Sequence, residues 1–210
     1  MTALHMGDLA FESGTSHDLD RIMQIEQDSF SAPWTRKMFE VELDSNPFGH
    51  LVTVRQVPPS GIRSELIGYV CFWVVFEELR LMTLAVDRSV RRQGIATALA
   101  YHAIVHGGSL GAIRAVLEVR ASNEAARRLY ERMGFHQVAV RAKYYTNPVE
   151  DAILMETDRR SAMDLRSAMD LRSAMDMRSA TSQPKAVSPA AGTQTCGSAE
   201  GVEPGKPSLL

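Results

Sequence analysis

The first 158 residues alternate between helix-like and strand-like spacing of apolar side chains. The segment 16–30 brings its apolar residues near one face of a helix, for which Ser16 is the expected N-cap: Leu19, Ile22, Met23 and Phe30. The segment 35–46 predicts a second helix, capped by Thr35. Three runs rich in β-branched and aromatic residues then predict strands at 50–56, 65–76 and 79–86. The VPPSG sequence between the first two strands indicates a hairpin loop.

The rest of this region alternates between helices and strands. The pattern predicts a helix over 90–106 that ends at Gly107 and Gly108, a strand over 112–119, a helix over 123–133 that ends at Gly134, and strands near 135–142 and 151–157. A meander followed by a β-α-β-α-β succession predicts an α/β (α+β) domain over residues 1–158. We expect a mixed, mostly antiparallel central sheet flanked by helices on both faces.

Composition changes sharply after Asp158. Residues 160–180 repeat RSAMDL with a period of six, which matches neither a helical stripe nor a strand alternation, and the residues beyond are rich in Pro, Gly, Ser, Thr and Ala. Such a segment cannot bury enough surface to offset the entropy lost on ordering. We therefore expect residues 159–210 to form a low-complexity, disordered tail. A partner-binding role for the repeat stays open.

Bulk composition narrows the class of protein. Of 210 residues, 45% are apolar, enough for one sizeable core, and the net charge of −2 does not favour direct nucleic-acid binding. No apolar run approaches the roughly 18 to 20 residues of a membrane span, and the N-terminus lacks the pattern of a secretory signal. Cys71 and Cys196 offer neither metal-site spacing nor a disulfide framework. These features favour a cytoplasmic protein without a metal, and we expect a monomer, an expectation that does not rest on composition.

The sequence VRRQGIA, at the start of the third helix, carries the first chemical signal. Helix N-termini present free N–H groups and partial positive charge, so they attract phosphate, and Arg91, Arg92 and Gln93 add further donors. Gly94 permits close approach of the backbone. The turn therefore indicates a pyrophosphate site, although an ordinary basic helix start on the surface is an equally good interpretation of these residues alone. Walker and dinucleotide-binding motifs are absent.

VRRQGIA resembles the (Arg/Gln)-x-x-Gly-x-(Gly/Ala) acetyl-CoA motif of the Gcn5-related N-acetyltransferases. Three further blocks, IEQDSFSAPWTRKMF, LEVRASNEAARRLYERMGF and YYTNPVEDAILM, are similar to the RimI-type subgroup of that family. The match runs in order from Asp18 to Glu156. The resemblance implies an acetyl-CoA-dependent enzyme that acetylates a protein N-terminus, with the N-terminal alanine of ribosomal protein bS18 as substrate.

The resemblance also implies site residues. Contacts to CoA would come from the splayed strand, the turn and the last helix start: Leu84, Ala85, Val86, Arg91, Arg92, Gln93, Gly94, Ile95, Ala96, Thr97 and Asn123. Asn123 is also the expected cap of the helix that it precedes. Trp34, Tyr144 and Tyr145 would flank the acceptor groove, where two exposed aromatic residues could hold an extended peptide, although packing at a sheet edge explains them equally well.

Glu118 and Tyr130 are the candidate catalytic pair. A peptide α-amine has a pKa of roughly 7.7 to 8.0, so a modest base suffices to deprotonate it, and Glu118 lies near a strand end where α/β sheets place their sites. Tyr130 lies two turns into its helix and can protonate a departing thiolate. The alternatives are that Glu118 pairs with Arg120 or Arg114, and that Tyr130 only packs on the sheet.

Other functions stay open at this point. The same fold can acetylate a lysine or a small-molecule amine, or bind CoA without catalysis. The hairpin over 55–65 is longer than the subgroup pattern, and Ala96 stands where many relatives carry glycine. His102 and His106 share a helical face without a third ligand nearby in sequence, so a metal site is not expected.

Overall fold

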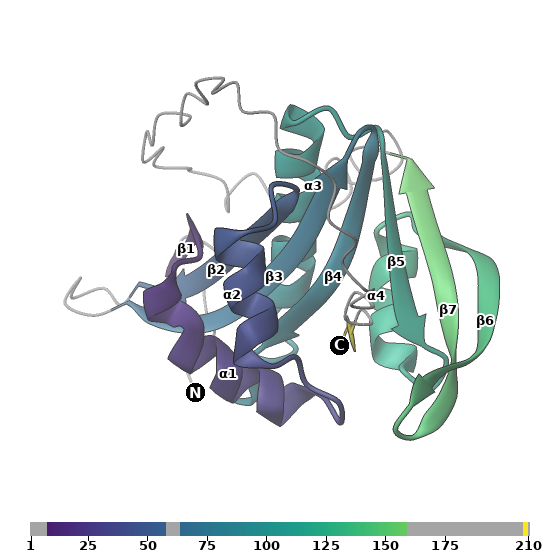
Figure 1. The fold of residues 1–210 in the computed structure, drawn as a ribbon, viewed down its shortest axis with the longest axis horizontal. Coiled ribbons are helices and arrows are strands. Elements are labelled where there is room, and N and C mark those ends of the chain that lie inside the picture. The colour runs from purple at the N-terminus through teal and green to yellow at the C-terminus, as the bar shows by residue number, and fades with distance from the viewer. Residues whose placement is uncertain (1–7, 58–63, 159–207, 210) are drawn as a thin grey trace, which may run out of the picture.

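The computed structural model describes residues 8–57, 64–158 and the backbone of 208–209. A single sheet holds eight strands in these residues, in the order β1-β2-β3-β4-β5-β7-β6 with β8 beside β4 (Figure 1). The strands are β1 (Leu9–Ser13), β2 (Gly49–Gln56), β3 (Glu65–Val75), β4 (Glu78–Val86), β5 (Arg114–Arg120), β6 (His136–Thr146), β7 (Val149–Asp158) and β8 (Ser208–Leu209). Only the β4–β5 and β4–β8 pairings are parallel, so the expected mixed, mostly antiparallel sheet is confirmed.

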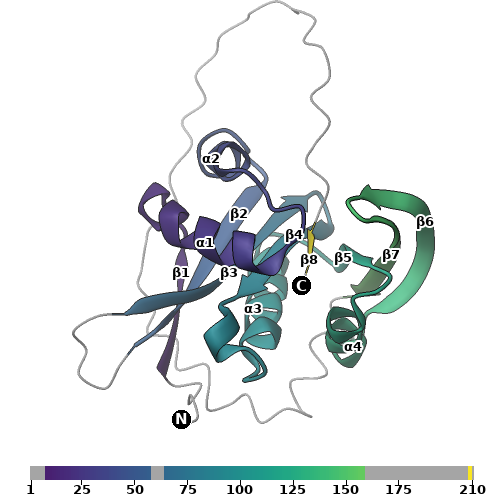
Figure 2. The ribbon, with the colours of Figure 1, turned by 90° about the horizontal axis from the view of Figure 1, so that it is seen from below.

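Two pairs of helices cover the two faces of the sheet (Figure 2). One face carries α1 (Leu19–Ser29) and α2 (Arg36–Asp44), and the other carries α3 (Ile95–Ser109) and α4 (Glu124–Arg132). The α2 cap is the predicted one, since Thr35 Oγ1 accepts a hydrogen bond from Met38 N. Ser16 was the wrong cap for α1, because residues Ser16–Asp18 form a short 3-10 turn and α1 begins only at Leu19.

Each face has its own hydrophobic core. Leu19, Ile22 and Ile25 of α1 pack with Phe39 of α2 against Tyr69 and other side chains of β3 and β4. The larger core on the opposite face joins α3 and α4 to the sheet. Because successive side chains of a strand point to opposite faces, each core takes every second residue of the central strands. This alternation decides which face each candidate site residue reaches.

The sheet opens between its two parallel strands. Pairing of β4 with β5 stops at Leu81 and Leu117. Beside this point the register between β3 and β4 shifts, so that Met82 has no partner on β3, whereas Leu81 and Thr83 do. A bulge of this kind bends and twists its strand. It directs the end of β4 away from β5, and the two residues of β8 lie alongside β4 in the opening, opposite Thr83 and Leu84.

The third helix differs from the prediction at both ends. It begins at Ile95 rather than at residue 90, because Arg92 and Gly94 both have left-handed φ values, of 66° and 85°. It also continues through Gly107, where a Cβ would lie 2.3 Å from Leu79 Cδ1. That glycine therefore permits close contact between α3 and β4, and the helix ends only at Ser109.

The sequence analysis did not predict β1, which pairs with β2 at one edge of the sheet. The other helices and strands up to residue 158 agree with the predicted ones to within a few residues, and β6 extends to Thr146. The loop of the β2–β3 hairpin and the tail from residue 159 lie outside the described residues, apart from the two residues of β8. No helix in the described part of the chain is long and apolar enough to cross a membrane.

Candidate active site

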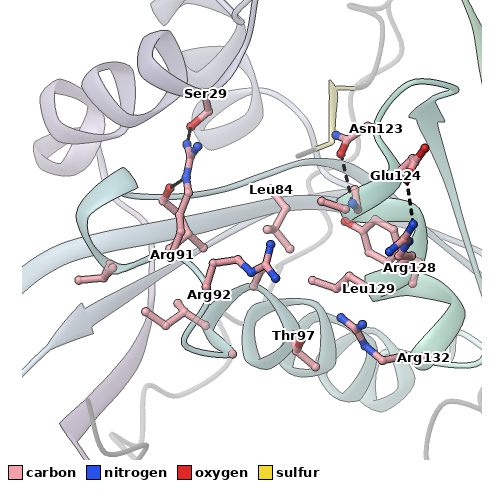
Figure 3. Close-up of a pocket in the computed structure, with 18 residues that line it drawn as sticks. Ser29, Leu84, Arg91, Arg92, Thr97, Asn123, Glu124, Arg128, Leu129 and Arg132 are labelled. Atoms are coloured by element: carbon pink, nitrogen blue, oxygen red, sulfur yellow. Dashed lines mark hydrogen bonds and ion pairs between the residues drawn. The ribbon is translucent and has the colours of Figure 1, made fainter. Parts of the chain in front are cut away.

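A cleft of about 690 Å³ lies beside the end of β4, on the α3/α4 face of the sheet (Figure 3). Its walls come from β4, from the turn before α3, and from α4. Ten residues predicted from the sequence line it: Leu84, Val86, Arg91, Arg92, Gly94, Ile95, Ala96, Thr97, Asn123 and Tyr130. Two other predicted CoA contacts, Ala85 and Gln93, are not among its lining residues. The side chain of Ala85 is buried in the core of the α1/α2 face.

The turn before α3 exposes backbone N–H groups to the cleft. Asp87 first caps a single 3-10 turn, Arg88–Val90, through hydrogen bonds from the backbone and hydroxyl of Ser89. Gly94 then takes a left-handed conformation with φ of 85°, and a Cβ there would meet nothing within 4 Å. Gly94 is therefore required by its backbone conformation and not by lack of space. The free N–H groups of the first turn of α3 lie directly after it.

The two arginines of this turn have different tasks. Arg91 Nε donates to Val86 O at 2.9 Å, and its Nη2 donates to Ser29 Oγ at 2.8 Å, so this side chain fastens the turn to β4 and α1. Arg92 is exposed, and in Figure 3 its guanidinium extends into the cleft between Leu84 and Thr97. An anion that enters the cleft would therefore contact the guanidinium of Arg92 rather than that of Arg91.

The start of α4 forms the opposite wall. Asn123 Oδ1 accepts a hydrogen bond from Ala126 N at 3.1 Å, which confirms the predicted cap. Arg128 and Arg132 also line the cleft, and the first of these pairs with Glu124 at 2.9 Å. Neither arginine was predicted from the sequence, although their spacing of four residues predicts a shared helical face. Together with Arg92 they make the rim of the cleft basic.

Tyr130 lies at the inner end of α4 and lines the cleft. It is 1% exposed and shares the buried face of its helix with Ala126 and Met133, while its ring contacts that of Phe135 at 5.5 Å. Burial raises the pKa of the Tyr130 phenol above its usual value, so the group holds its proton at neutral pH. It can therefore act as a donor toward a charge that develops in the cleft.

Glu118 faces away from this cleft. Its neighbours Leu117 and Val119 belong to the α3/α4 core, so the alternation of β5 directs Glu118 to the other face. The carboxylate is 2% exposed, and Arg141 Nη1 of β6 lies 2.6 Å from its Oε1. Arg120 and Arg114, the alternative partners of Glu118 considered from the sequence, do not pair with it.

Those alternative partners are engaged elsewhere. Arg120 pairs with Glu150, and Arg114 pairs with Glu78. Tyr144 is the other neighbour of Glu118: burial, the hydrogen bond to Glu118 and the carboxylate charge together raise the pKa of the Tyr144 phenol to about 12. Glu118 thus lies among groups that can donate to a carboxylate.

The aromatic residues expected along the acceptor groove are less exposed than predicted. Trp34 is 3% exposed and packs against Phe39 at 5.2 Å. Tyr145 is also buried, beneath the guanidinium of Arg120 at 4.1 Å from its ring centre. Tyr144 alone of the three is half-exposed. The hydrophobic effect and the cation–π contact therefore place two of these rings behind the surface rather than on it.

Metal ligands are not assembled in the part of the chain that the structure describes, where no group of three or more His, Cys, Asp and Glu side chains could hold an ion. Cys71 is buried within the α1/α2 core. The second cysteine lies outside the described residues.

Comparison with known families now decides the class of protein. The model of the acetyltransferase (GNAT) family matches residues 19–135, which is more than half of the chain. The chain belongs to the GNAT family. It is therefore an N-acetyltransferase, as the four sequence blocks indicated. GNAT acetyltransferases use acetyl-CoA, and the free helix N-terminus and the basic rim are chemically suited to its phosphates. The part of β4 beyond its pairing with β5, beside which β8 lies, has backbone groups suited to the amide-containing arm of acetyl-CoA.

Individual relatives refine this GNAT assignment. The chain is 37% identical over 140 residues to the [ribosomal protein bS18]-alanine N-acetyltransferase of Escherichia coli K12, a match that covers 66% of this chain and 89% of the relative. The crystal structure of the ribosomal-protein-S18-alanine N-acetyltransferase from E. coli superposes with a TM-score of 0.63 at 32% identity, over 71% of this chain and 93% of that one. Arabidopsis thaliana NAA60 in complex with acetyl-CoA shares the fold, with a TM-score of 0.65 at 24% identity over 71% and 98% of the two chains.

Proposed function

We propose that this GNAT enzyme transfers an acetyl group from acetyl-CoA to the α-amine of a protein N-terminus, with the N-terminal alanine of ribosomal protein bS18 as its substrate. The single observation that carries the chemistry is the position of Glu118 and Tyr130 on opposite faces of the sheet, beside the opening between β4 and β5. The substrate assignment is supported by the E. coli relative and the four sequence blocks.

The cosubstrate would approach from the α3/α4 face. Its pyrophosphate would bind at the N–H groups after Gly94, with Arg92 and Arg132 supplying charge. Its extended arm would lie along the β4 edge near Leu84 and Val86, where pairing with β5 has ended. Acetyl-CoA supplies an activated thioester there. Backbone N–H groups near Val86 would stabilise negative charge on the thioester oxygen as it develops.

The acceptor amine would arrive from the α1/α2 face, where Glu118 lies. Glu118 takes the proton that the amine must lose, directly or through one water molecule. The amine nitrogen then forms a bond to the acetyl carbon, and the carbon–sulfur bond breaks. Tyr130 gives its proton to the sulfur as negative charge develops on it, and the tyrosinate regains a proton, in balance with the one that Glu118 has taken from the amine, before the next turnover. Because base and acid face the opening from different sides, both substrates can be present at once.

Acetylation assays can test this function. Purified enzyme, acetyl-CoA and a peptide with the N-terminal sequence of bS18 are expected to release CoA and to yield a peptide heavier by one acetyl group, located on the first residue by mass spectrometry. A peptide with a blocked N-terminus and a free lysine is the matched comparison. Preferential turnover of the lysine peptide would favour a lysine acetyltransferase, and no turnover of any N-terminal peptide would contradict the proposal.

Two variants test the assigned roles. Glu118→Gln removes the base, and Tyr130→Phe removes the proton donor while keeping the ring. Each is expected to lower kcat by about 100-fold or more, as is typical for the loss of general acid–base catalysis, with little change in the KM for acetyl-CoA. Lys37→Ala replaces an exposed side chain on α2, far from the opening. It is the control for effects of expression and purification on the measured rates.

A further inference from the structure

Glu26 is a buried carboxyl group that the mechanism above does not use. It lies on α1, is fully shielded from solvent, and faces β3 and β4. Its Oε1 accepts a hydrogen bond from Trp34 N at 2.7 Å, and its Oε2 accepts one from the Tyr69 hydroxyl. Thr83 of β4 supplies a second hydroxyl beside it. One acidic side chain thus ties the sheet to the backbone of the connection between α1 and α2.

That connection, residues 30–35, reaches the side of the sheet where Glu118 lies. Ser31 Oγ donates to Asn147 O at 3.1 Å, in the turn between β6 and β7. The same carbonyl accepts from Arg120 Nη2 at 3.0 Å. The connection and the β6–β7 turn therefore meet above the end of β5, which carries Glu118. An acceptor that reaches Glu118 from this face would pass along the connection.

Placing a carboxyl group at the buried position of Glu26 costs free energy of folding. Burial without hydrogen bonds is strongly unfavourable for a carboxylate, and an apolar residue of similar volume is often no less stable. Trp34 already packs against Phe39, and Phe39 contacts Tyr69 edge-to-face at 5.5 Å, so the rings alone would hold the local core. What they cannot supply is a hydrogen-bond acceptor for Trp34 N.

We propose that Glu26 is a positioning residue for the acceptor: through its hydrogen bond to Trp34 N, it holds the connection 30–35 in place as one wall of the acceptor site. This inference rests on the proposed function, because it takes the acceptor to be a peptide that binds on the Glu118 face. Glu26 itself touches neither substrate.

The ionisation of Glu26 supports this role. Burial raises the pKa of the Glu26 carboxyl to about 7, so its charge changes in the neutral range. The titratable groups that face it stay neutral there, because burial raises the pKa of both Tyr69 and Cys71. An ionised acceptor makes the stronger hydrogen bond. The hydrogen bond from Trp34 N to Glu26 should therefore become stronger as pH rises through 7.

Steady-state kinetics of Glu26→Ala and Glu26→Gln test the role. Loss of a hydrogen bond to a charged group predicts that Glu26→Ala raises the KM for the acceptor peptide by about tenfold or more, with the KM for acetyl-CoA unchanged. Glu26→Gln keeps an oxygen for Trp34 N and should restore most of the affinity.

Glu42 provides a matched control. It is a second buried carboxyl, on α2, and accepts hydrogen bonds from Asn46 Nδ2 and Trp73 Nε1, both at 2.7 Å, without touching the connection. Glu42→Ala should cost stability but leave the KM for the acceptor unchanged. An equal rise of the acceptor KM in both alanine variants, or an equal rise of both KM values in Glu26→Ala, would overturn the inference.

The pH dependence of binding can be measured with the acetylated product peptide, chosen without His or Cys in its sequence. Its N-terminus is an amide, so the titration of the amine does not contribute. The wild-type enzyme should bind this peptide more tightly at pH 8 than at pH 6, and Glu26→Gln should lose that difference. A pH dependence that persists in Glu26→Gln contradicts the inference.

Amide hydrogen exchange at Trp34 gives a readout that does not depend on the acceptor. Exchange should be faster in Glu26→Ala than in the wild type and Glu42→Ala, and equal rates would overturn the inference. If the wild type acetylates no N-terminal peptide, the proposed function fails, and exchange at Trp34 alone then decides whether Glu26 holds the connection.

Discussion

Arg141 Nη1 lies 2.6 Å from Glu118 Oε1, and this ion pair joins the middle of the sheet to its outermost strand. The carboxylate is almost completely buried, whereas the guanidinium side chain is 48% exposed. Arg141 therefore reaches inward from the surface of β6 to a group that solvent hardly touches. The contact orients the proposed base, and the guanidinium also lies over the Tyr144 ring, 5.6 Å from its centre.

Removal of that guanidinium should impair catalysis more than folding. Arg141→Met keeps the aliphatic stem but leaves the Glu118 carboxylate without its cation, so the base is no longer held in one position. Because small misplacements of reacting groups are costly, we expect kcat to fall by about tenfold or more, with partial recovery in Arg141→Lys. Steady-state kinetics with both substrates measure this. Activity equal to the wild type in Arg141→Met would show that Glu118 needs no such support.

Two glycines that flank α3 allow backbone strain to be separated from function. Gly94 and Gly111 both have left-handed φ values, 85° and 104°, and in both cases an added Cβ would meet nothing within 4 Å. An alanine at either position should destabilise the fold by about 1 kcal/mol. Only Gly94→Ala should also raise the KM for acetyl-CoA, because it disturbs the N–H groups beside the cleft. Thermal unfolding and steady-state kinetics of both variants provide the comparison, and equal KM values would argue against a phosphate site at this turn.

The β8 residues occupy the edge of β4 that the arm of acetyl-CoA would use. Ser208 and Leu209 pair with Thr83 and Leu84 in the opening between β4 and β5. Under the proposed function, binding of acetyl-CoA has to displace them. Proline removes a backbone N–H, so a Ser208→Pro/Leu209→Pro variant should bind acetyl-CoA more tightly than the wild type in calorimetry. Ser198→Pro is the control, and unchanged affinity in the double variant would show that the two do not compete.

Histidines on the α3/α4 face should make the protein less stable in acid. His50 and His106 contact each other at 5.3 Å between ring centres, and His102 stacks on Phe11 at 5.0 Å. Burial, and then the neighbouring His106, lower the pKa of both His50 and His102 below the usual value. The unfolded chain therefore takes up protons on these histidines first as pH falls, so their contribution to the free energy of unfolding decreases on acidification through the ordinary histidine range, whereas the raised pKa of Glu26 contributes in the opposite direction.

Urea unfolding at pH 7.5 and pH 5 checks this direction. His102→Gln should lose less stability between the two pH values than the wild type. His136→Gln, on the exposed surface of β6, should lose as much as the wild type does. Equal losses in all three proteins would contradict the assignment to the buried imidazoles.

The parts of this protein that could be predicted from its sequence are those governed by neighbours in the chain. Apolar periodicity identified the helices and most strands, and the caps at Thr35 and Asn123 follow from hydrogen bonds that span three residues. The family blocks and the proposed phosphate-binding turn are also local. Because a cap or a turn depends on residues within one helical turn, its chemistry is visible in the sequence itself.

Tertiary structure decided what depends on contacts between distant residues. The start of α3 moved to Ile95 because the chain takes left-handed conformations at Arg92 and Gly94, and Gly107 serves contact with β4 rather than helix termination. Arg91 is engaged by Val86 and Ser29, whereas Arg92 extends into the cleft, and sequence alone could not distinguish the two arginines.

The proposed base shows the same division most clearly. Glu118 is proposed from the sequence, but its ion pair with Arg141 depends on β6 folding back beside β7, and β7 pairing with β5. The burial of Trp34 likewise depends on Glu26 and Phe39 from two different helices. Residue types therefore determined which chemistry this chain can perform. The order of strands in the sheet decided which groups meet, because a side chain's partners across strands are fixed by register and not by distance along the chain.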